Sequence, residues 1–104
     1  MECVRFQDGR YDMLYGRDEQ ILGALAMGAR GAVGSTYNYM GGCYNRLIKA
    51  FERGDIEAAR EEQAHSAALV DLLGSSAFGA GVHVGKAIAV IKGCPIGDAR
   101  APWT

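Results

Sequence analysis

Residues 11–38 read YDMLYGRDEQILGALAMGARGAVGSTYN, and their pattern indicates a strand, a helix and a second strand. Its first residues alternate crudely between apolar and polar, which predicts a short strand that ends at Gly16. Apolar residues with helical spacing then predict a helix over residues 18–28, with Asp18 as its N-cap. The uncharged run at residues 31–34 predicts a second strand with both faces buried. This order indicates a parallel β-α-β unit and therefore an α/β architecture.

Three more helices are predicted after this unit, because apolar residues recur there with helical spacing. The apolar stripe of the first contains Tyr44, Leu47, Ile48 and Phe51. Gly54 should end this helix, Asp55 should cap the second, and Gly74 should close it. The expected inner face of the second consists of Ile56, Ala59, Gln63, Ala67, Val70 and Leu73. Gly93 and Pro95 should end the third helix. The apolar stripe of this third helix consists of Val84, Ala87, Ile88 and Ile91.

The whole chain, residues 1–104, is predicted to be a single partial domain. The strands with the helix between them occupy about residues 10–38, helices occupy 39–93, and 94–104 form an irregular tail. Two parallel strands with exposed edges do not make an independently stable sheet. We therefore expect the chain to be a fragment of a larger fold whose other strands lie upstream.

Composition and charge exclude several classes of protein. The chain is 49% hydrophobic and 22% charged, as is typical of a globular protein. Eleven basic and twelve acidic residues give a net charge of −1 without a basic cluster, so no nucleic-acid partner is expected. The longest uncharged apolar stretch, residues 21–29, is too short to cross a bilayer, and the N-terminus has no signal-peptide core. We expect no membrane partner and a cytoplasmic location.

The cysteines indicate neither a disulfide framework nor a metal site. Cys3, Cys43 and Cys94 are odd in number and widely separated, and His65 and His83 are the only histidines. Reduced, mostly buried thiols are therefore the expectation, and no metal is predicted.

Polar residues follow both predicted strands, at the edge where ligands gather in α/β folds. Asp18 and Glu19 are adjacent carboxylates that could accept hydrogen bonds from sugar hydroxyls. Ser35 and Thr36 could donate to a carboxylate or a carbonyl. Local pattern alone favours helix capping for both pairs.

The other residues with chemical potential favour structural roles. Lys49, Lys86 and Lys92 all fall in predicted helices, and none is placed like a Schiff-base lysine. His65 and His83 are predicted to be solvated or partly buried rather than basic catalysts. Gly28, Gly31 and Gly34 recur at every third residue, as in some phosphate-binding loops. No lysine follows them in the arrangement that such a loop needs, so close packing explains these glycines better than phosphate binding. Tyr37 and Tyr39 follow the second strand, and packing is the favoured role for both.

Two segments together carry a family resemblance. GRDEQILGALAMGARGAVGSTYNYMGG at residues 16–42, followed by LIKAFERGDIEAARE at 47–61, resembles the N-acetylneuraminate lyases (sialic acid aldolases) of the dihydrodipicolinate synthase superfamily. The resemblance implies a (β/α)8 TIM barrel with a C-terminal helical extension. This chain would then supply the C-terminal part: strands seven and eight with their helices and part of the extension. The implied substrate-binding residues are Gly16, Asp18, Glu19 and Ser35, which face the polyhydroxylated tail of the sugar acid.

The resemblance also implies a reaction. These class I aldolases cleave N-acetylneuraminate reversibly to N-acetylmannosamine and pyruvate in sialic acid catabolism, through a Schiff base on a strand-six lysine. A tyrosine on an earlier strand handles protons, and a Ser/Thr pair holds the pyruvate carboxylate. None of these elements maps onto this sequence, so we expect no catalytic residue in the chain and no activity from it alone. No cofactor is implied, and the full-length family implies a homotetramer.

Two other interpretations remain open. The chain could be a non-catalytic interaction module that associates with intact subunits, or part of another 2-oxo-acid aldolase of the superfamily.

Overall fold

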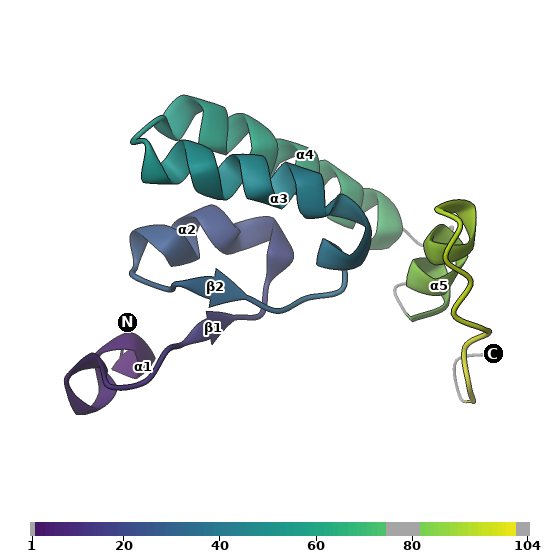
Figure 1. Cartoon of the computed structure of the whole chain (residues 1–104), viewed down its shortest axis with the longest axis horizontal. Coiled ribbons are helices and arrows are strands. Elements are labelled where there is room, and N and C mark those ends of the chain that lie inside the picture. The colour runs from purple at the N-terminus through teal and green to yellow at the C-terminus, as the bar shows by residue number, and fades with distance from the viewer. Residues whose placement is uncertain (1, 75–81, 102–104) are drawn as a thin grey trace.

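The computed structural model describes residues 2–74 and 82–101, and these form a layered arrangement of helices around one short parallel sheet. Helices α3 (Tyr37–Glu52) and α4 (Ile56–Gly74) pack as a pair, α2 (Ile21–Ala26) lies beneath them, and the two strands lie beyond α2 (Figure 1). Helix α1 (Glu2–Arg5) and helix α5 (Val82–Ile91) lie at opposite ends of the molecule (Figure 1). The layers leave the strand ends accessible from the α5 side.

Both predicted strands are present, and they pair as predicted in parallel. Strand β1 (Leu14–Tyr15) pairs with β2 (Gly31–Ala32), with Leu14 opposite Gly31 and Tyr15 opposite Ala32. The amide of Val33 donates to the carbonyl of Tyr15 over 2.9 Å, which continues the pairing by one step. The strands are shorter than predicted, because in the described residues no further strand flanks either of them. Leu14 is 60% exposed and Val33 is 66% exposed.

The segment between the strands is helical, but Asp18 does not cap it as predicted. A 3₁₀ turn, η2 (Asp18–Gln20), precedes α2, and no side chain caps either element. The carboxylate of Asp18 turns away from the helix and binds Thr36 instead. The predicted stop is confirmed, because α2 ends at Ala26 and Gly28 has a φ of +96°, which favours glycine.

The boundaries of α3 and α4 follow the predicted signals. Gly54, at a φ of +78°, ends α3. The Asp55 carboxylate accepts the amide of Ala58 over 3.1 Å, which confirms the N-cap of α4. The core cluster is formed by Ile21 of α2, Tyr44, Leu47 and Ala50 of α3, and Ala59 of α4.

The inner face of α4 was predicted only in part. Ala59 is fully buried, whereas Ile56 is 46% exposed and does not belong to the core. Ser66 is fully buried although it is polar, because its hydroxyl pairs with the phenol of Tyr44. A hydrogen-bonded serine can therefore occupy a core position that an apolar pattern does not predict.

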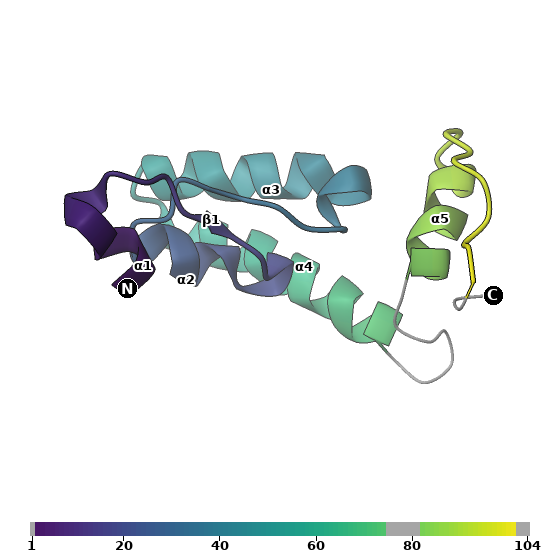
Figure 2. The ribbon, with the colours of Figure 1, turned by 90° about the horizontal axis from the view of Figure 1, so that it is seen from below.

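The two ends of the described chain contribute little to the hydrophobic core. Helix α1 leads into a 3₁₀ turn, η1 (Phe6–Gly9), in which Phe6 stacks on Tyr11. Helix α5 has no buried residue, and Figure 2 shows it set apart from the other helices. Gly93, at a φ of +80°, follows α5, as predicted. Residues 94–101 form no further helix or strand, and 102–104 of the predicted tail lie outside the described residues.

The cysteines differ from the expectation. Cys43 is buried, but Cys3 and Cys94 are exposed. Burial, with the neighbouring Glu62 as a secondary cause, raises the pKa of the Cys43 thiol to about 11. Cys43 therefore stays a neutral thiol that donates to the Glu62 carbonyl over 3.3 Å.

Candidate functional site

A cleft of about 800 Å³ opens where the two strands end. One wall comes from the turn after β1 and the other from the turn after β2, because parallel strands present their carboxyl ends at the same edge. The end of α4 and the inner side of α5 complete the cleft. Its lining from the two turns and the start of α3 consists of Gly16, Arg17, Asp18, Glu19, Gly34, Ser35, Thr36, Asn38 and Tyr39. All four residues predicted to bind a sugar acid are in this set.

Asp18 is the most firmly held of them. It is only 6% exposed, and its Oδ2 accepts two hydrogen bonds from Thr36, one from the amide over 2.8 Å and one from the hydroxyl over 2.5 Å. These bonds join the turn after β1 to the turn after β2. The other oxygen, Oδ1, lies against Gly34, where a Cβ atom would sit only 1.6 Å from it. Gly34 is therefore glycine because the Asp18 carboxylate occupies the space of its side chain.

Behind Asp18, a chain of hydroxyl groups runs into the core. The Thr36 hydroxyl lies 2.6 Å from the phenol oxygen of Tyr44, which in turn lies 2.6 Å from Ser66 Oγ. Tyr44 is 2% exposed and Ser66 is fully buried. The Asp18 carbonyl accepts the side-chain amide of Gln63 over 3.3 Å. Helices α3 and α4 thus hold the floor of the cleft through polar contacts as well as apolar ones.

The other three predicted residues are held more loosely. Glu19 is partly buried and pairs with Arg17 over 3.4 Å at the surface. Ser35 is exposed, and its carbonyl accepts the side-chain amide of Asn38 over 3.0 Å. Nothing lies within 4 Å of a Cβ built on Gly16, so a ligand could approach the backbone there. These groups offer two acceptor oxygens and one hydroxyl beside the fixed Asp18.

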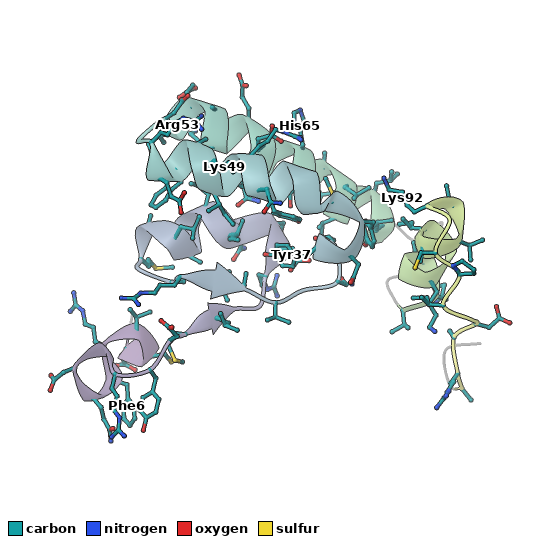
Figure 3. The ribbon with its side chains drawn as sticks, in the orientation of Figure 1. Phe6, Tyr37, Lys49, Arg53, His65 and Lys92 are labelled. Atoms are coloured by element: carbon teal, nitrogen blue, oxygen red, sulfur yellow. The ribbon has the colours of Figure 1, made fainter. Side chains whose placement is uncertain are left out.

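The far side of the cleft carries positive charge. Lys86 and Lys92, both predicted to be simple helix lysines, line it from the side of α5. The ammonium of Lys86 donates to the carbonyls of Ile96 and Gly97, each over 3.3 Å, and so fixes the segment after α5. Figure 3 shows Lys92 where α5 faces the end of α4. Acidic groups on one wall and lysines on the other suit a ligand with both hydroxyl groups and a carboxylate.

The two tyrosines after β2 have different surroundings. Tyr39 lines the cleft, whereas Tyr37, the first residue of α3 (Figure 3), packs against Tyr44 of the same helix, with 4.3 Å between the ring centroids. Burial, and secondarily the charge of Asp18, raises the pKa of both phenols. The Tyr37 hydroxyl is buried without a hydrogen-bond partner among the described residues. The expected packing role fits Tyr37, whereas Tyr39 lines the cleft and also lies against Gly85 of α5.

The cleft gives no indication of a metal or a membrane. Among residues 2–74 and 82–101, no group of three or more His, Cys, Asp and Glu side chains is arranged to hold a metal ion. No helix in this part of the chain is long and apolar enough to span a bilayer. His65 lies away from the cleft, beside Glu62 on the outer surface of α4.

The four predicted residues meet in one cleft, but the contacts that hold them there were not predicted. Thr36 was recognised as a possible donor to a carboxylate, yet the carboxylate that it binds is Asp18 itself. The roles of Tyr44, Ser66 and Gly34 were not anticipated, because each depends on a contact between distant segments. The available signal was Ser66, a small polar residue next to Ala67 of the predicted inner face.

Comparison with known proteins places this architecture in a family. The sequence profile described as "Dihydrodipicolinate synthetase family" matches residues 2–104, and the chain belongs to this family. Its relatives include proteins named N-acetylneuraminate lyase. The one from Sus scrofa is 43% identical over 103 residues, which cover 97% of this chain and 32% of the relative. The one from Xenopus tropicalis is 46% identical over 101 residues, covering 96% of this chain and 32% of the relative.

Solved structures agree with this membership. The native N-acetylneuraminate lyase (sialic acid aldolase) of Aliivibrio salmonicida superposes with a TM-score of 0.87 at 38% identity, over 98% of this chain and 33% of that one. The N-acetylneuraminate lyase of Proteus mirabilis superposes with a TM-score of 0.85 at 37% identity, over 96% of this chain and 33% of that one. These neighbours are TIM-barrel lyases. The chain spans about a third of the length of the relatives that it matches.

Proposed function

We propose that this chain forms the sugar-facing wall of an N-acetylneuraminate lyase, a carbon-carbon lyase that cleaves N-acetylneuraminate to N-acetylmannosamine and pyruvate. The observation that carries the proposal is the shared cleft. Gly16, Asp18, Glu19 and Ser35 come from two separate turns, and all of them line it. Ionised carboxylates and a hydroxyl beside open backbone are suited to a polyhydroxylated sugar acid.

The chain's place in the barrel is part of the proposal. Strands β1 and β2 are strands seven and eight, and residues of about 39–93 supply helix eight and part of a C-terminal extension. The division into 10–38, 39–93 and an irregular tail at 94–104 follows from this assignment. A parallel pair joined through a helix, with side chains of the site after each strand, supports it.

The bond-breaking groups lie outside these residues. A Schiff base needs an amine at the reacting carbon, and the three lysines, Lys49, Lys86 and Lys92, are all in or next to helices rather than after a strand. Lys86 is engaged with two backbone carbonyls, and Lys49 is exposed on α3. The chain therefore binds and positions the sugar, and it releases no pyruvate alone. The complete enzyme is a cytoplasmic homotetramer that needs no cofactor, as the family resemblance implies.

A chimera tests this function directly. Residues 2–104 replace the matching third of the Sus scrofa relative, whose remaining two thirds supply the rest of the protein. The chimera should release pyruvate from N-acetylneuraminate, and Glu19→Gln should raise KM by about tenfold because a charged hydrogen-bond acceptor is lost. Glu57→Gln, on the exposed side of α4, is the matched control and should leave the kinetics unchanged.

A chimera that folds with native helix content but releases no pyruvate would contradict the proposal. Release of pyruvate by the 104-residue chain alone would contradict the assignment of the chemistry to other residues.

A second candidate rests on the exposed apolar side chains of the strands. Leu14 and Val33 are more than half exposed, and such surface favours association with another polypeptide. In this role the chain is a non-catalytic module that binds intact lyase subunits. Co-purification of the tagged chain with a full-length relative would support it, and elution as a separate species at equal concentrations would exclude it.

A further inference from the structure

The two oxygens of the Asp18 carboxylate have different surroundings. Oδ2 accepts the amide and the hydroxyl of Thr36, so its hydrogen-bonding capacity is largely used. Oδ1 lies over Gly34, and both residues line the cleft. A carboxylate fixed in this way presents one oxygen to the protein and the other to the cleft.

The direction of the hydroxyl chain follows from counting protons. Thr36 uses its one hydroxyl proton on Asp18, so at the 2.6 Å contact with Tyr44 it must accept. Tyr44 therefore donates to Thr36, and at its own 2.6 Å contact with Ser66 it accepts. Ser66 then donates its one proton to Tyr44 over 2.6 Å, and its contact with the Asp18 carbonyl, at 3.5 Å, is the weaker of the two. The protons of Ser66, Tyr44 and Thr36 are in this way all directed along the chain toward the Asp18 carboxylate. Such a chain strengthens each bond in it, because every donor is polarised by the next acceptor.

The direction of these hydrogen bonds depends on Tyr44. Its burial raises the pKa of the phenol, so the group stays protonated and remains a donor. At 2% exposure, water cannot take its place. Without the phenol, the Thr36 hydroxyl can still donate to Oδ2, but it loses the donor that fixes its orientation and strengthens that bond.

We propose that Tyr44 is a positioning residue: through Thr36 it locks the Asp18 carboxylate so that Oδ1 stands ready to accept a ligand hydroxyl. This inference rests on the proposed function for the identity of the ligand, a polyhydroxylated sugar acid. The locking of Asp18 does not depend on the proposed function, because it is a property of the protein without ligand. The lock lowers the cost of ordering the acceptor when the ligand binds.

The locking is tested in the free 104-residue chain by amide hydrogen exchange. The Thr36 amide reports directly, because it donates to Asp18 Oδ2. Tyr44→Phe should speed the exchange of this amide about tenfold relative to amides of α3 and α4, since the acceptor is no longer held. Tyr37→Phe is the matched control: it removes a neighbouring buried phenol that has no partner in the described residues, and Thr36 should be unaffected.

The ligand part is tested by titration with N-acetylneuraminate, followed by amide chemical shifts of the cleft. Tyr44→Phe should bind about tenfold more weakly than the wild type, and Tyr37→Phe should bind equally well. The amide shifts of α3 and α4 away from the cleft should stay at their wild-type positions in both variants. Weaker binding with these shifts unchanged separates positioning from a general loss of folding, which would move them.

Each outcome decides a different claim. If Tyr44→Phe leaves both Thr36 exchange and N-acetylneuraminate affinity at wild-type values, the positioning role is overturned. If Thr36 exchange responds as expected but the wild type does not bind N-acetylneuraminate, the lock stands and the proposed function fails.

A second pair of variants covers the case in which Tyr44→Phe does not fold. Thr36→Val keeps the shape of the side chain but removes the hydroxyl, whereas Thr36→Ser keeps the hydroxyl. Thr36→Val should weaken N-acetylneuraminate binding about tenfold, and Thr36→Ser should restore it. Equal affinity of these two variants would overturn the inference.

Discussion

At the scale of single residues, Asp18 both joins two turns and lines the cleft. One of its oxygens ties the turns after β1 and β2 together through Thr36, and the other faces the cleft over Gly34. The carboxylate can take this position only because residue 34 has no side chain. The site thus depends on a glycine that contributes no chemical group of its own.

Substitution of this glycine should be costly. In Gly34→Ala the new Cβ would lie 1.6 Å from Asp18 Oδ1, so the carboxylate must rotate and give up its two bonds from Thr36. We expect the free energy of unfolding in urea to fall by about 2–3 kcal/mol, which is typical of overpacking combined with a broken buried polar contact.

Gly23→Ala is the matched control for this change. Gly23 lies in α2, and nothing is within 4 Å of a Cβ built there. This variant should gain about 0.5–1 kcal/mol, because alanine restricts the unfolded chain and suits a helix. Equal effects of the two substitutions would mean that the Asp18 carboxylate does not occupy the space above residue 34.

Residue types and spacing predicted that these side chains lie together at the strand ends, but not their contacts. Asp18, Glu19 and Ser35 stood out because polar groups directly follow short apolar strands. The interpretation of Asp18 as a helix cap was wrong, because local pattern cannot show that Thr36 offers it two donors from the next strand end. Contacts between segments are decided by packing, which a local pattern does not contain.

At the scale of elements, the pair of α3 and α4 is the most firmly joined part of the described chain. An apolar cluster forms its centre, and Arg46 of α3 closes its outer edge by binding both carboxylate oxygens of Glu62 of α4, over 2.6 and 2.9 Å. The Arg46 hydrogen bonds lower the pKa of Glu62 from 4.5 to about 2. Charge-assisted bidentate pairs of this kind are stronger than single surface ion pairs.

Acid should weaken this pair of helices in a defined window. The pKa of Glu62 is lower in the folded than in the unfolded chain, so its contribution to stability is complete above pH 4.5 and is lost as the pH falls toward about 2. Glu62→Gln should therefore lower the urea midpoint at pH 7 but not at pH 2. Glu57→Gln, which removes an exposed pair with Arg60, should change the midpoint little at either pH. An equal loss for Glu62→Gln at both pH values would contradict the role of the ionised pair.

Signals at the ends of elements were more informative than signals on their faces. Asp55, Gly28 and Gly54 marked boundaries correctly, because caps and positive φ angles are local requirements. The predicted inner face of α4 was wrong at Ile56, which is 46% exposed. It also omitted Ser66, whose burial depends on the phenol of Tyr44 in α3.

At the scale of the whole molecule, the core is concentrated in α2, α3 and α4. Helix α5 lines one side of the cleft, but none of its residues is buried, and Ile91 is 83% exposed. The sequence predicted the order of the elements and the parallel pairing, since periodicity and helix ends are local. It could not predict the arrangement of α5 around the cleft, since the stripe of this helix has no buried partner in the described residues.

Native-state hydrogen exchange should reproduce this distribution. Amides of α3 and α4 should be the most protected, and those of α5 should exchange fastest among the longer helices, because few buried contacts oppose local opening. Protection of α5 equal to that of α3 would contradict the distribution of the core.

The assignment of the cleft to a sugar acid is tested by mapping amide shifts in this chain during titration with N-acetylneuraminate. We predict saturable shifts, with a dissociation constant of about 1 mM or weaker for an incomplete site, confined to residues 16–19, 34–39 and the facing part of α5. Lys49, on the surface of α3 outside the cleft lining, should not respond, and Glu19→Gln should weaken the shifts. Absence of shifts at these residues, or shifts centred elsewhere, would contradict the assignment of this cleft to a sugar acid.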